Sequence, residues 1–181
     1  MSELLRFANR QRHRASVGDA RKALGSLEKE GGVSHFGWSE SMSVGIDLLD
    51  DDHDIIARLT ISLQDCVEGH NDSALSIDIC ERLIAFIEFH MAREEKVMEA
   101  CGYPGLKSHQ DDHVRFILGL YAFMDRYVVH RDRVILRELL SYLREWFEQH
   151  VLAQDTHLAP FVVNNRRAHA IAQAFGQLNP C

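Results

Sequence analysis

From Asp47 onward, apolar residues recur every three or four positions, which is the spacing of one face of an α-helix. Four such stripes follow one another, and no segment alternates with a period of two over the length of a strand. The stripes are Leu49, His53, Ile56, Leu63 and Val67; Ile79, Leu83, Phe86, Ile87, His90, Glu94 and Val97; His109, His113, Phe116, Leu120 and Phe123; and Leu136, Leu139, Leu143, Trp146 and His150. Each stripe predicts an amphipathic helix.

Short breaks rich in Gly, Asn and Pro separate the stripes. Gly69-His70-Asn71-Asp72 follows the first stripe, and Cys101-Gly102-Tyr103-Pro104-Gly105 follows the second. Four amphipathic helices of about 20 residues with short connections are typical of an antiparallel bundle. We therefore predict an all-α fold, an up-down-up-down four-helix bundle whose last helix ends before Pro160.

The charge distribution divides the chain into three parts. Residues 1–34 carry an excess of three positive charges, whereas the rest carries an excess of ten negative charges. We predict a basic N-terminal extension at 1–34, the bundle at 35–163 and a short helical or loose C-terminal tail at 164–181. The spacing of Val17, Ala20, Leu24 and Leu27 favours a short helix in the extension. A loosely packed extension is the preferred interpretation, and docking to a protein partner or a membrane surface is the alternative.

Length and composition exclude several classes of protein. The chain has 181 residues, which is about one domain, and no apolar run is long enough for a transmembrane segment. No basic start precedes an apolar stretch, so we expect a cytoplasmic protein. The net charge of −7 argues against binding to nucleic acid. The four cysteines form no CxxC pair, and we expect reduced thiols at Cys66, Cys80, Cys101 and Cys181.

Histidine is unusually frequent, with 11 residues in the chain. Five of them fall on the apolar faces, and each predicted helix carries at least one: His53, His90, His109, His113 and His150. A buried imidazole needs a polar partner for its nitrogens. One inward histidine is usually a satisfied core residue, but five in one bundle favour a shared metal site.

The spacing of these histidines supports a metal site. His90 and Glu94 are four residues apart, so both project from one helix face. His109 and His113 have the same spacing. Asp155 follows His150 by five residues, which a regular helix would splay by about 140°. We therefore predict a local irregularity near Asp155.

The candidate ligands are five imidazoles and two carboxylates, which are enough for two metal ions. Imidazole-rich sites suit Fe, Zn, Cu or Ni. Other metal and catalytic motifs are missing from the sequence: HExxH, Glu-x-x-His, a Gly-rich phosphate loop and GxSxG. The lack of Glu-x-x-His disfavours the carboxylate-rich di-iron oxidases.

Several motifs together resemble the hemerythrin family, and more closely its bacterial members, from about Trp38 to Phe161. The matching pieces are Trp38, Val44-Gly45-Ile46-Asp47, Asp50-Asp51-Asp52-His53, His90-Met91-Ala92-Arg93-Glu94-Glu95, Met98, Gly102-Tyr103-Pro104, His109-Gln110-Asp111-Asp112-His113, Trp146-Phe147-Glu148-Gln149-His150 and Asp155. The combination is specific because seven ligand positions occur in the family's order.

The resemblance implies a role for each of these seven residues. The centre would hold two iron ions, as Fe2+ or Fe3+, joined by an oxo or hydroxo bridge. The carboxylates of Glu94 and Asp155 would also bridge the two ions. By this resemblance His109, His113 and His150 bind one coordinatively full iron. His53 and His90 bind the other, which keeps one position open for O2. The implied function is reversible O2 binding for storage, delivery or buffering, without enzymatic activity.

An apolar wall beside the open position is expected to keep water away from bound O2. The candidates, each within four residues of a ligand, are Ile56, Met91, Trp146 and Val151. Three positions depart from the usual family pattern, with Met91 in place of Phe, Asp52 in place of Gln, and Leu158 where many members carry Tyr. Asp52 either accepts a hydrogen bond from a ligand imidazole or is solvated, and we expect it to be solvated.

The sequence is compatible with three other functions. Residues 1–34 would make the chain a sensor if they passed a ligand-dependent change to a partner. The same metals would make it an enzyme if they reduced peroxide, O2 or nitric oxide. A bundle with a purely structural zinc site is the third alternative.

Overall fold

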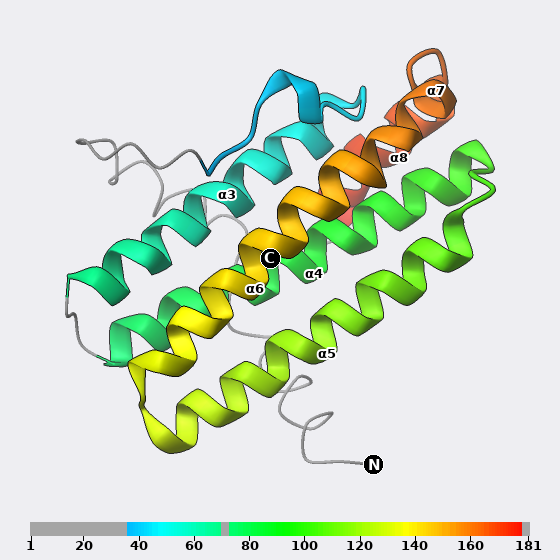
Figure 1. Cartoon of the computed structure of the whole chain (residues 1–181). Helices are drawn as coiled ribbons and strands as arrows, with labels where there is room; N and C mark the ends of the chain where they lie inside the picture. The colour runs from blue at the N-terminus through cyan, green and yellow to red at the C-terminus, as the bar shows by residue number, and fades with distance from the viewer. Residues whose placement is uncertain (1–35, 70–72, 179–181) are drawn as a thin grey trace.

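Four long helices lie side by side in the computed structural model, which describes residues 36–69 and 73–178 (Figure 1). They are α3 (Asp47–Glu68), α4 (Ser73–Cys101), α5 (Leu106–His130) and α6 (Arg133–Ala153). No strand occurs in the described residues, so the predicted all-α fold is confirmed. Each long helix carries one of the four predicted stripes.

The four helices enclose a shared interior. Helix α3 contacts α4 and α6, and helix α5 contacts the same two helices from the other side. In Figure 1, α3 ends and α4 begins at one end of the bundle, and α4 meets α5 at the other end. Consecutive helices therefore run in opposite directions, as short connections require.

The helix ends follow from local chemistry. Helix α4 ends at Cys101, and Gly102 then adopts a φ of 68°, a left-handed conformation that glycine accepts without strain. At the start of α6, the Asp132 side chain accepts a hydrogen bond of 2.8 Å from the backbone N–H of Val134. This cap satisfies a backbone donor that the helix itself cannot satisfy.

Short elements surround the bundle. A 3-10 helix, η1 (Glu40–Met42), precedes α3, and η2 (Asp155–Leu158) and α7 (Ala159–Val162) follow α6. The last element, α8 (Arg166–Leu178), is a 13-residue helix that packs along α4. Most of the segment expected as a short helical or loose tail is therefore a packed helix, while residues 179–181, including Cys181, lie outside the described residues.

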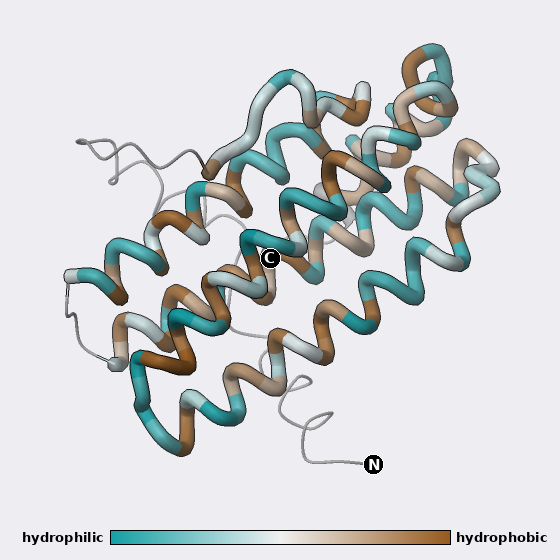
Figure 2. The backbone as a smooth tube through the Cα atoms, in the orientation of Figure 1, coloured by the Kyte–Doolittle hydropathy of each residue, from teal (hydrophilic) through white to brown (hydrophobic). Residues whose placement is uncertain are grey.

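The core consists of two apolar clusters. The larger one fills the bundle between the four long helices, and includes Leu63, Ile87, Leu120 and Leu139. The smaller one lies at the end where η2, α7 and α8 pack against the bundle, and includes Leu49, Val97, Met98, Leu158 and Ala168. Brown apolar segments alternate with teal polar ones along each long helix, as amphipathic packing requires (Figure 2).

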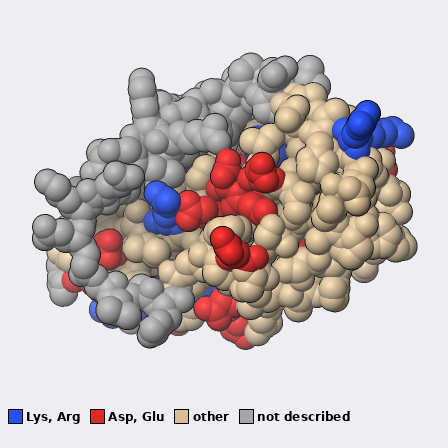
Figure 3. Space-filling view, turned by 90° about the horizontal axis from the view of Figure 1, so that it is seen from above, with Lys and Arg blue, Asp and Glu red and all other residues tan. Residues whose placement is uncertain are grey.

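Polar and charged groups lie mostly outside this core. Acidic side chains gather near the middle of the face shown in Figure 3.

No described helix is both long and apolar enough to cross a bilayer. Cys66 and Cys80 are buried free thiols, and burial raises the pKa of Cys80 to about 12. The predicted basic extension at 1–34 lies outside the described residues.

Candidate metal centre

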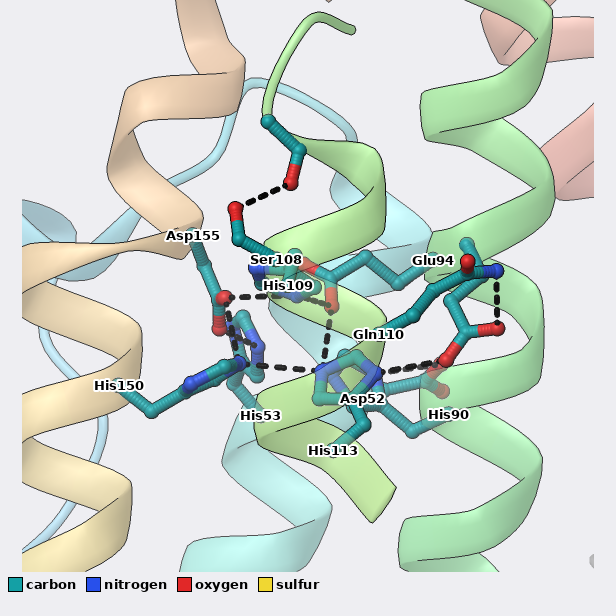
Figure 4. Close-up of polar contacts among 12 residues, drawn as sticks. Asp52, His53, His90, Glu94, Ser108, His109, Gln110, His113, His150 and Asp155 are labelled. Atoms are coloured by element: carbon teal, nitrogen blue, oxygen red, sulfur yellow. Dashed lines mark hydrogen bonds and ion pairs between the residues drawn. The ribbon is translucent and has the colours of Figure 1, made fainter. Parts of the chain in front are cut away.

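The seven candidate ligands converge inside the bundle (Figure 4). Helix α3 contributes one of them, α4 and α5 contribute two each, α6 contributes one and η2 contributes the last. In that order they are His53, His90, Glu94, His109, His113, His150 and Asp155. Each is at most 3% exposed, so the cluster is fully buried.

This polar cluster separates the two apolar clusters of the core. On α3, His53 lies between Leu49 of the smaller cluster and Ile56 of the larger one. On α4, Glu94 lies between Met91 of the larger cluster and Val97 of the smaller one. Burying so many polar groups between apolar layers is unfavourable unless a partner satisfies them.

The candidate ligands form two overlapping groups, each with ligand atoms within 4.8 Å of one another. The first group is Glu94, His109, His113 and His150. The second group is His53, His90, Glu94 and Asp155. Because both groups contain Glu94, they lie next to each other, as a centre for two metal ions requires.

The carboxylate of Asp155 faces both groups. Its Oδ2 lies 3.3 Å from Nε2 of His53, in the second group. Its Oδ1 lies 3.1 Å from Nε2 of His150 and 3.5 Å from Nε2 of His109, in the first group. One oxygen toward each group is the arrangement of a carboxylate that bridges two cations.

Glu94, on α4, lies beside the two first-group histidines of the neighbouring helix α5. Its Oε2 lies 3.0 Å from Nε2 of His109 and 3.4 Å from Nε2 of His113. Its Oε1 is buried and has no hydrogen-bond partner. The second oxygen is therefore free for the second group, to which Glu94 also belongs.

Several atoms of the cluster have close neighbours but no aligned hydrogen bond. Nε2 of His53 and both oxygens of Asp155 are buried without a hydrogen-bond partner, despite separations of 3.1 to 3.5 Å. By contrast, Nε2 of His113 and Nε2 of His150 share a hydrogen bond of 3.0 Å. Cations shared among these side chains would satisfy the unpaired ring nitrogen and carboxylate oxygens. The residues present therefore fit a pair of metal ions.

The electrostatics of the carboxylates also favour cations. Burial alone would raise the pKa of Glu94, but hydrogen bonds with His109 and His113 hold its pKa well below the usual value. Burial and the charge of Glu94 would likewise raise the pKa of Asp155, but His150 and His53 lower it to about 2. Both side chains are therefore anionic and able to bind metal.

Burial lowers the pKa of a histidine, and the neighbouring side chains decide whether the net shift is down or up. Burial and the neighbouring His53 lower the pKa of His90, despite the opposing effect of Asp52. For His113, burial opposes protonation, but contacts with Glu94 and Glu95 raise the pKa to about 9. A metal that binds His113 must therefore displace a proton that the carboxylates hold there in its absence.

The predicted irregularity at Asp155 is confirmed. Helix α6 ends at Ala153, and Gln154 leaves the helical region with φ of −123° and ψ of −54° before η2 begins. This change of direction turns Asp155 back toward His150, five residues earlier.

The expectation that Asp52 is solvated was wrong. Asp52 is 2% exposed, because the buried guanidinium of Arg93 donates a hydrogen bond of 2.6 Å to its Oδ2. The same oxygen lies 3.4 Å from Nδ1 of His90. A ligand histidine commonly donates its second N–H to a carboxylate, but no local spacing pairs Asp52 with His90, which lies 38 residues later.

A second outer carboxylate was not predicted. Glu95 Oε1 lies 2.9 Å from Nδ1 of His113, and Gln110 donates a hydrogen bond of 3.0 Å to Glu95 Oε2. This contact turns Nε2 of His113 toward Glu94 and His150. Glu95 therefore orients a candidate ligand without belonging to either group.

The residues predicted to line an O2 pocket lie near the cluster. Ile56, Met91 and Val151 are buried in the larger apolar cluster. Trp146 is partly buried and stacks on the His150 ring, with centroids 4.2 Å apart. Phe147, which was not among the predicted pocket residues, meets the His53 ring edge-on at 6.1 Å. The pocket itself stays a prediction.

Comparison with known proteins identifies a family whose profile covers the whole candidate metal centre. The family profile described as the hemerythrin HHE cation binding domain matches residues 44–162. This range contains all seven candidate ligands and ends before α8.

Similar curated proteins are named bacteriohemerythrin or myohemerythrin. A bacteriohemerythrin from Ralstonia nicotianae is 33% identical over 118 residues, covering 65% of this chain and 82% of the relative. A bacteriohemerythrin from Pseudomonas aeruginosa is 27% identical over 123 residues, covering 68% and 78%. A myohemerythrin from Theromyzon tessulatum is 24% identical over 118 residues, covering 65% and 86%. No solved structure matches the chain.

Proposed function

The chain belongs to the hemerythrin family, and we propose that it binds O2 reversibly at a non-haem di-iron centre. The observation that carries this proposal is the placement of the Asp155 oxygens, one toward His53 and the other toward His150 and His109. A carboxylate placed between two histidine groups supports a pair of metal ions rather than a single ion.

We assign the ligands by the two groups. His109, His113 and His150 would bind one iron, His53 and His90 would bind the other, and Glu94 and Asp155 would bridge them. The second iron would then have one histidine fewer, which would leave a position for O2. When bound, the two ferrous ions supply the electrons that O2 takes up on binding and returns on release.

The chain contributes orientation and charge to this centre. Glu95 holds Nδ1 of His113, so that Nε2 faces the cluster. The anionic side chains of Glu94 and Asp155 offset the repulsion between two cations. Neutral imidazoles outnumber the carboxylates, which favours reversible binding over cleavage of the O–O bond.

Burial around the centre excludes water. Ile56, Met91 and Val151 are each at most 4% exposed. A dry apolar wall limits the access of protons that would drive O2 toward reduction. This environment favours a carrier or buffer of O2 over an enzyme.

Metal analysis and absorption spectroscopy test the proposal directly. We expect two iron ions per chain, and a visible absorption band that appears when the anaerobic ferrous protein meets O2 and disappears when O2 is removed. A single iron, or a spectrum that does not respond to O2, would contradict the proposal. Sustained consumption of O2 with a reductant, without a long-lived coloured form, would support an enzyme instead.

A regulatory role of residues 1–34 is a separate proposal. Their basic charge suits an acidic protein partner, which would make the chain part of a sensing system. Deleting residues 1–34 and comparing the proteins that co-purify with each form tests this role. Unchanged co-purification would remove its support.

A further inference from the structure

Helix α8 packs against the bundle beyond the part that the hemerythrin profile matches. Ala168 and Ala172 of α8 are at most 1% exposed and belong to the smaller apolar cluster. Their small side chains let α8 approach α4 closely. Helix α8 is therefore positioned to act on residues of α4 near the metal centre.

One ring contact joins α8 to α4, and a second continues it within α4. The ring of Phe175 lies 5.4 Å from the ring of Phe89, at an interplanar angle of 58°. The guanidinium carbon of Arg93 lies 4.5 Å from the centroid of the same Phe89 ring. Since Phe89 and Arg93 are four residues apart, one helix face presents both, and the cation–π contact restricts the Arg93 side chain.

Arg93 holds a buried carboxylate in place. Its Nη1 donates a hydrogen bond of 2.6 Å to Oδ2 of Asp52 and one of 3.3 Å to the carbonyl of Leu48. Arg93 is 6% exposed and Asp52 is 2% exposed. A buried ion pair of this kind stays in one geometry, because neither charge has access to bulk water.

The carboxylate of Asp52 connects this pair to a candidate ligand. The oxygen that accepts from Arg93 lies 3.4 Å from Nδ1 of His90, and Figure 4 shows Asp52 beside His90. Because Nδ1 faces Asp52, Nε2 is the nitrogen that His90 offers to a metal. A carboxylate on the far side of a ligand imidazole orients the ring and increases its strength as a donor.

From these contacts we infer that Arg93 is a positioning residue for His90, and that α8 keeps Arg93 in place through Phe175 and Phe89. The inference rests on the proposed function, since it assigns His90 to the iron with the open position. By holding Oδ2 of Asp52, Arg93 keeps the His90–Asp52 hydrogen bond long. It thereby limits the electron donation of His90 to the metal, which favours the ferrous state that binds O2.

Two substitutions are expected to have opposite effects on the metal. Arg93→Gln releases Asp52, shortens its hydrogen bond with His90 and lowers the reduction potential of the iron centre. Asp52→Asn removes the negative charge and raises that potential. Both substitutions also disturb a buried ion pair, so both lower thermal stability. Changes of opposite sign in potential therefore separate tuning of the metal from a purely structural role.

A matched control exists elsewhere in the bundle. Arg126 also stacks on a phenylalanine, with its guanidinium carbon 5.5 Å from the Phe123 centroid, and pairs with Glu138 at 2.8 Å. None of these three residues belongs to either ligand group. Arg126→Gln and Phe123→Leu are therefore expected to leave the potential unchanged.

The decisive measurement uses the zinc-loaded full-length chain, because zinc is diamagnetic and independent of O2. We expect the exchangeable Nδ1–H resonance of His90 to move downfield in Arg93→Gln, and to move upfield in Asp52→Asn. Phe175→Leu keeps an apolar side chain but removes the ring, and should move the resonance in the same direction as Arg93→Gln. Spectroelectrochemistry of the iron-loaded variants then gives the potentials.

The variant Arg93→Lys distinguishes an effect of the positive charge at residue 93 from an effect of the position of the guanidinium group. Lysine keeps the positive charge but loses the planar fork and its stacking, so the His90 resonance should still move. A wild-type resonance in Arg93→Lys would assign the effect to charge and overturn the positioning role. Potentials of Arg93→Gln and Asp52→Asn that shift in the same direction would also overturn it, and an unchanged resonance in Phe175→Leu would overturn the role of α8.

The outcome also distinguishes this inference from the proposed function. A wild-type protein that binds O2, combined with variants that behave like Arg126→Gln, would overturn the inference alone. A wild-type protein that takes up two zinc ions but does not bind O2 would overturn the proposed function. Shifted His90 resonances in that same protein would still support the positioning of His90.

Discussion

Oδ1 of Asp155 lies 3.1 Å from Nε2 of His150, although the two residues are five positions apart in the chain. A continuous helix would point them about 140° away from each other. The end of α6 at Ala153 and the non-helical backbone of Gln154 bring them together. The break in the helix therefore creates the contact between Asp155 and the two histidine groups.

Asp155→Asn should lower the metal content from two ions per chain toward one. The substitution keeps the shape of the side chain but removes the charge that offsets the repulsion between the two cations. Metal analysis after exhaustive dialysis measures the stoichiometry. Asp125→Asn, which changes an exposed residue of α5, is the matched control and should keep both ions. Two tightly held ions in Asp155→Asn would contradict a bridging role.

His113→Ala and Glu94→Ala should each abolish the stable two-metal site. Each removes a buried candidate ligand, and Glu94 belongs to both groups. We expect loss of the O2-dependent absorption band together with loss of metal. His130→Ala removes an exposed histidine of the same helix as His113 and should leave metal and spectrum intact. An unchanged spectrum in either ligand variant would show that the assignment is wrong.

Substitution of Met91 should act on bound O2 rather than on metal content. Met91 is 4% exposed in the larger apolar cluster and is not a candidate ligand. Leucine or phenylalanine at this position keeps the wall apolar but changes its shape and flexibility. We therefore expect a changed lifetime of the O2 adduct, followed by absorption, with two irons still bound. A fall to one iron would instead indicate a role in assembly.

The stability of the metal-free protein should depend on pH through His113 and Asp155. Burial opposes protonation of His113, but Glu94 and Glu95 raise its pKa from 6.5 to about 9. Because the folded state then binds this proton more tightly than the unfolded state, the stabilisation is complete below pH 6.5 and is lost as the pH rises toward 9. For Asp155, whose pKa falls from 3.8 to about 2, the stabilisation is complete above pH 3.8 and is lost toward pH 2.

Thermal unfolding of the metal-free protein, followed by circular dichroism, measures this dependence. We expect the highest Tm between pH 3.8 and 6.5, as far as these two groups determine it. Metal binding displaces the His113 proton, so affinity for zinc should increase from pH 6.5 to 9. A Tm that does not fall on the alkaline side would argue against the pairing of His113 with the two carboxylates.

Deleting residues 1–34 should leave the metal centre intact. All seven candidate ligands lie between His53 and Asp155, outside the deleted segment. The shortened chain should bind two irons and show the same O2-dependent absorption as the full chain. Loss of metal on deletion would show that the extension is part of the fold.

Much of the centre could be predicted from periodicity. The apolar stripes placed His53, His90, His109, His113 and His150 on inward faces, and the structure confirms that all five are buried. The spacing of four between His90 and Glu94 placed both on one side of α4. Such inferences succeed because the pitch of a helix relates sequence separation directly to direction.

Other features depend on which helices become neighbours. Asp52 reads as one more exposed acid in a run of aspartates, yet Arg93 of the next helix makes it part of the buried interior. Phe147 meets His53, and Phe175 meets Phe89, across distances of many residues in the chain.

Local periodicity thus specified the helices, their inward faces and the ligand types, because these depend on residues three to five positions apart. The burial of Asp52, the division of the Asp155 oxygens between the two groups and the packing of α8 arose only when the helices assembled. The reason is physical: the free energy of burying a charge depends on the partner that faces it, and that partner comes from another helix.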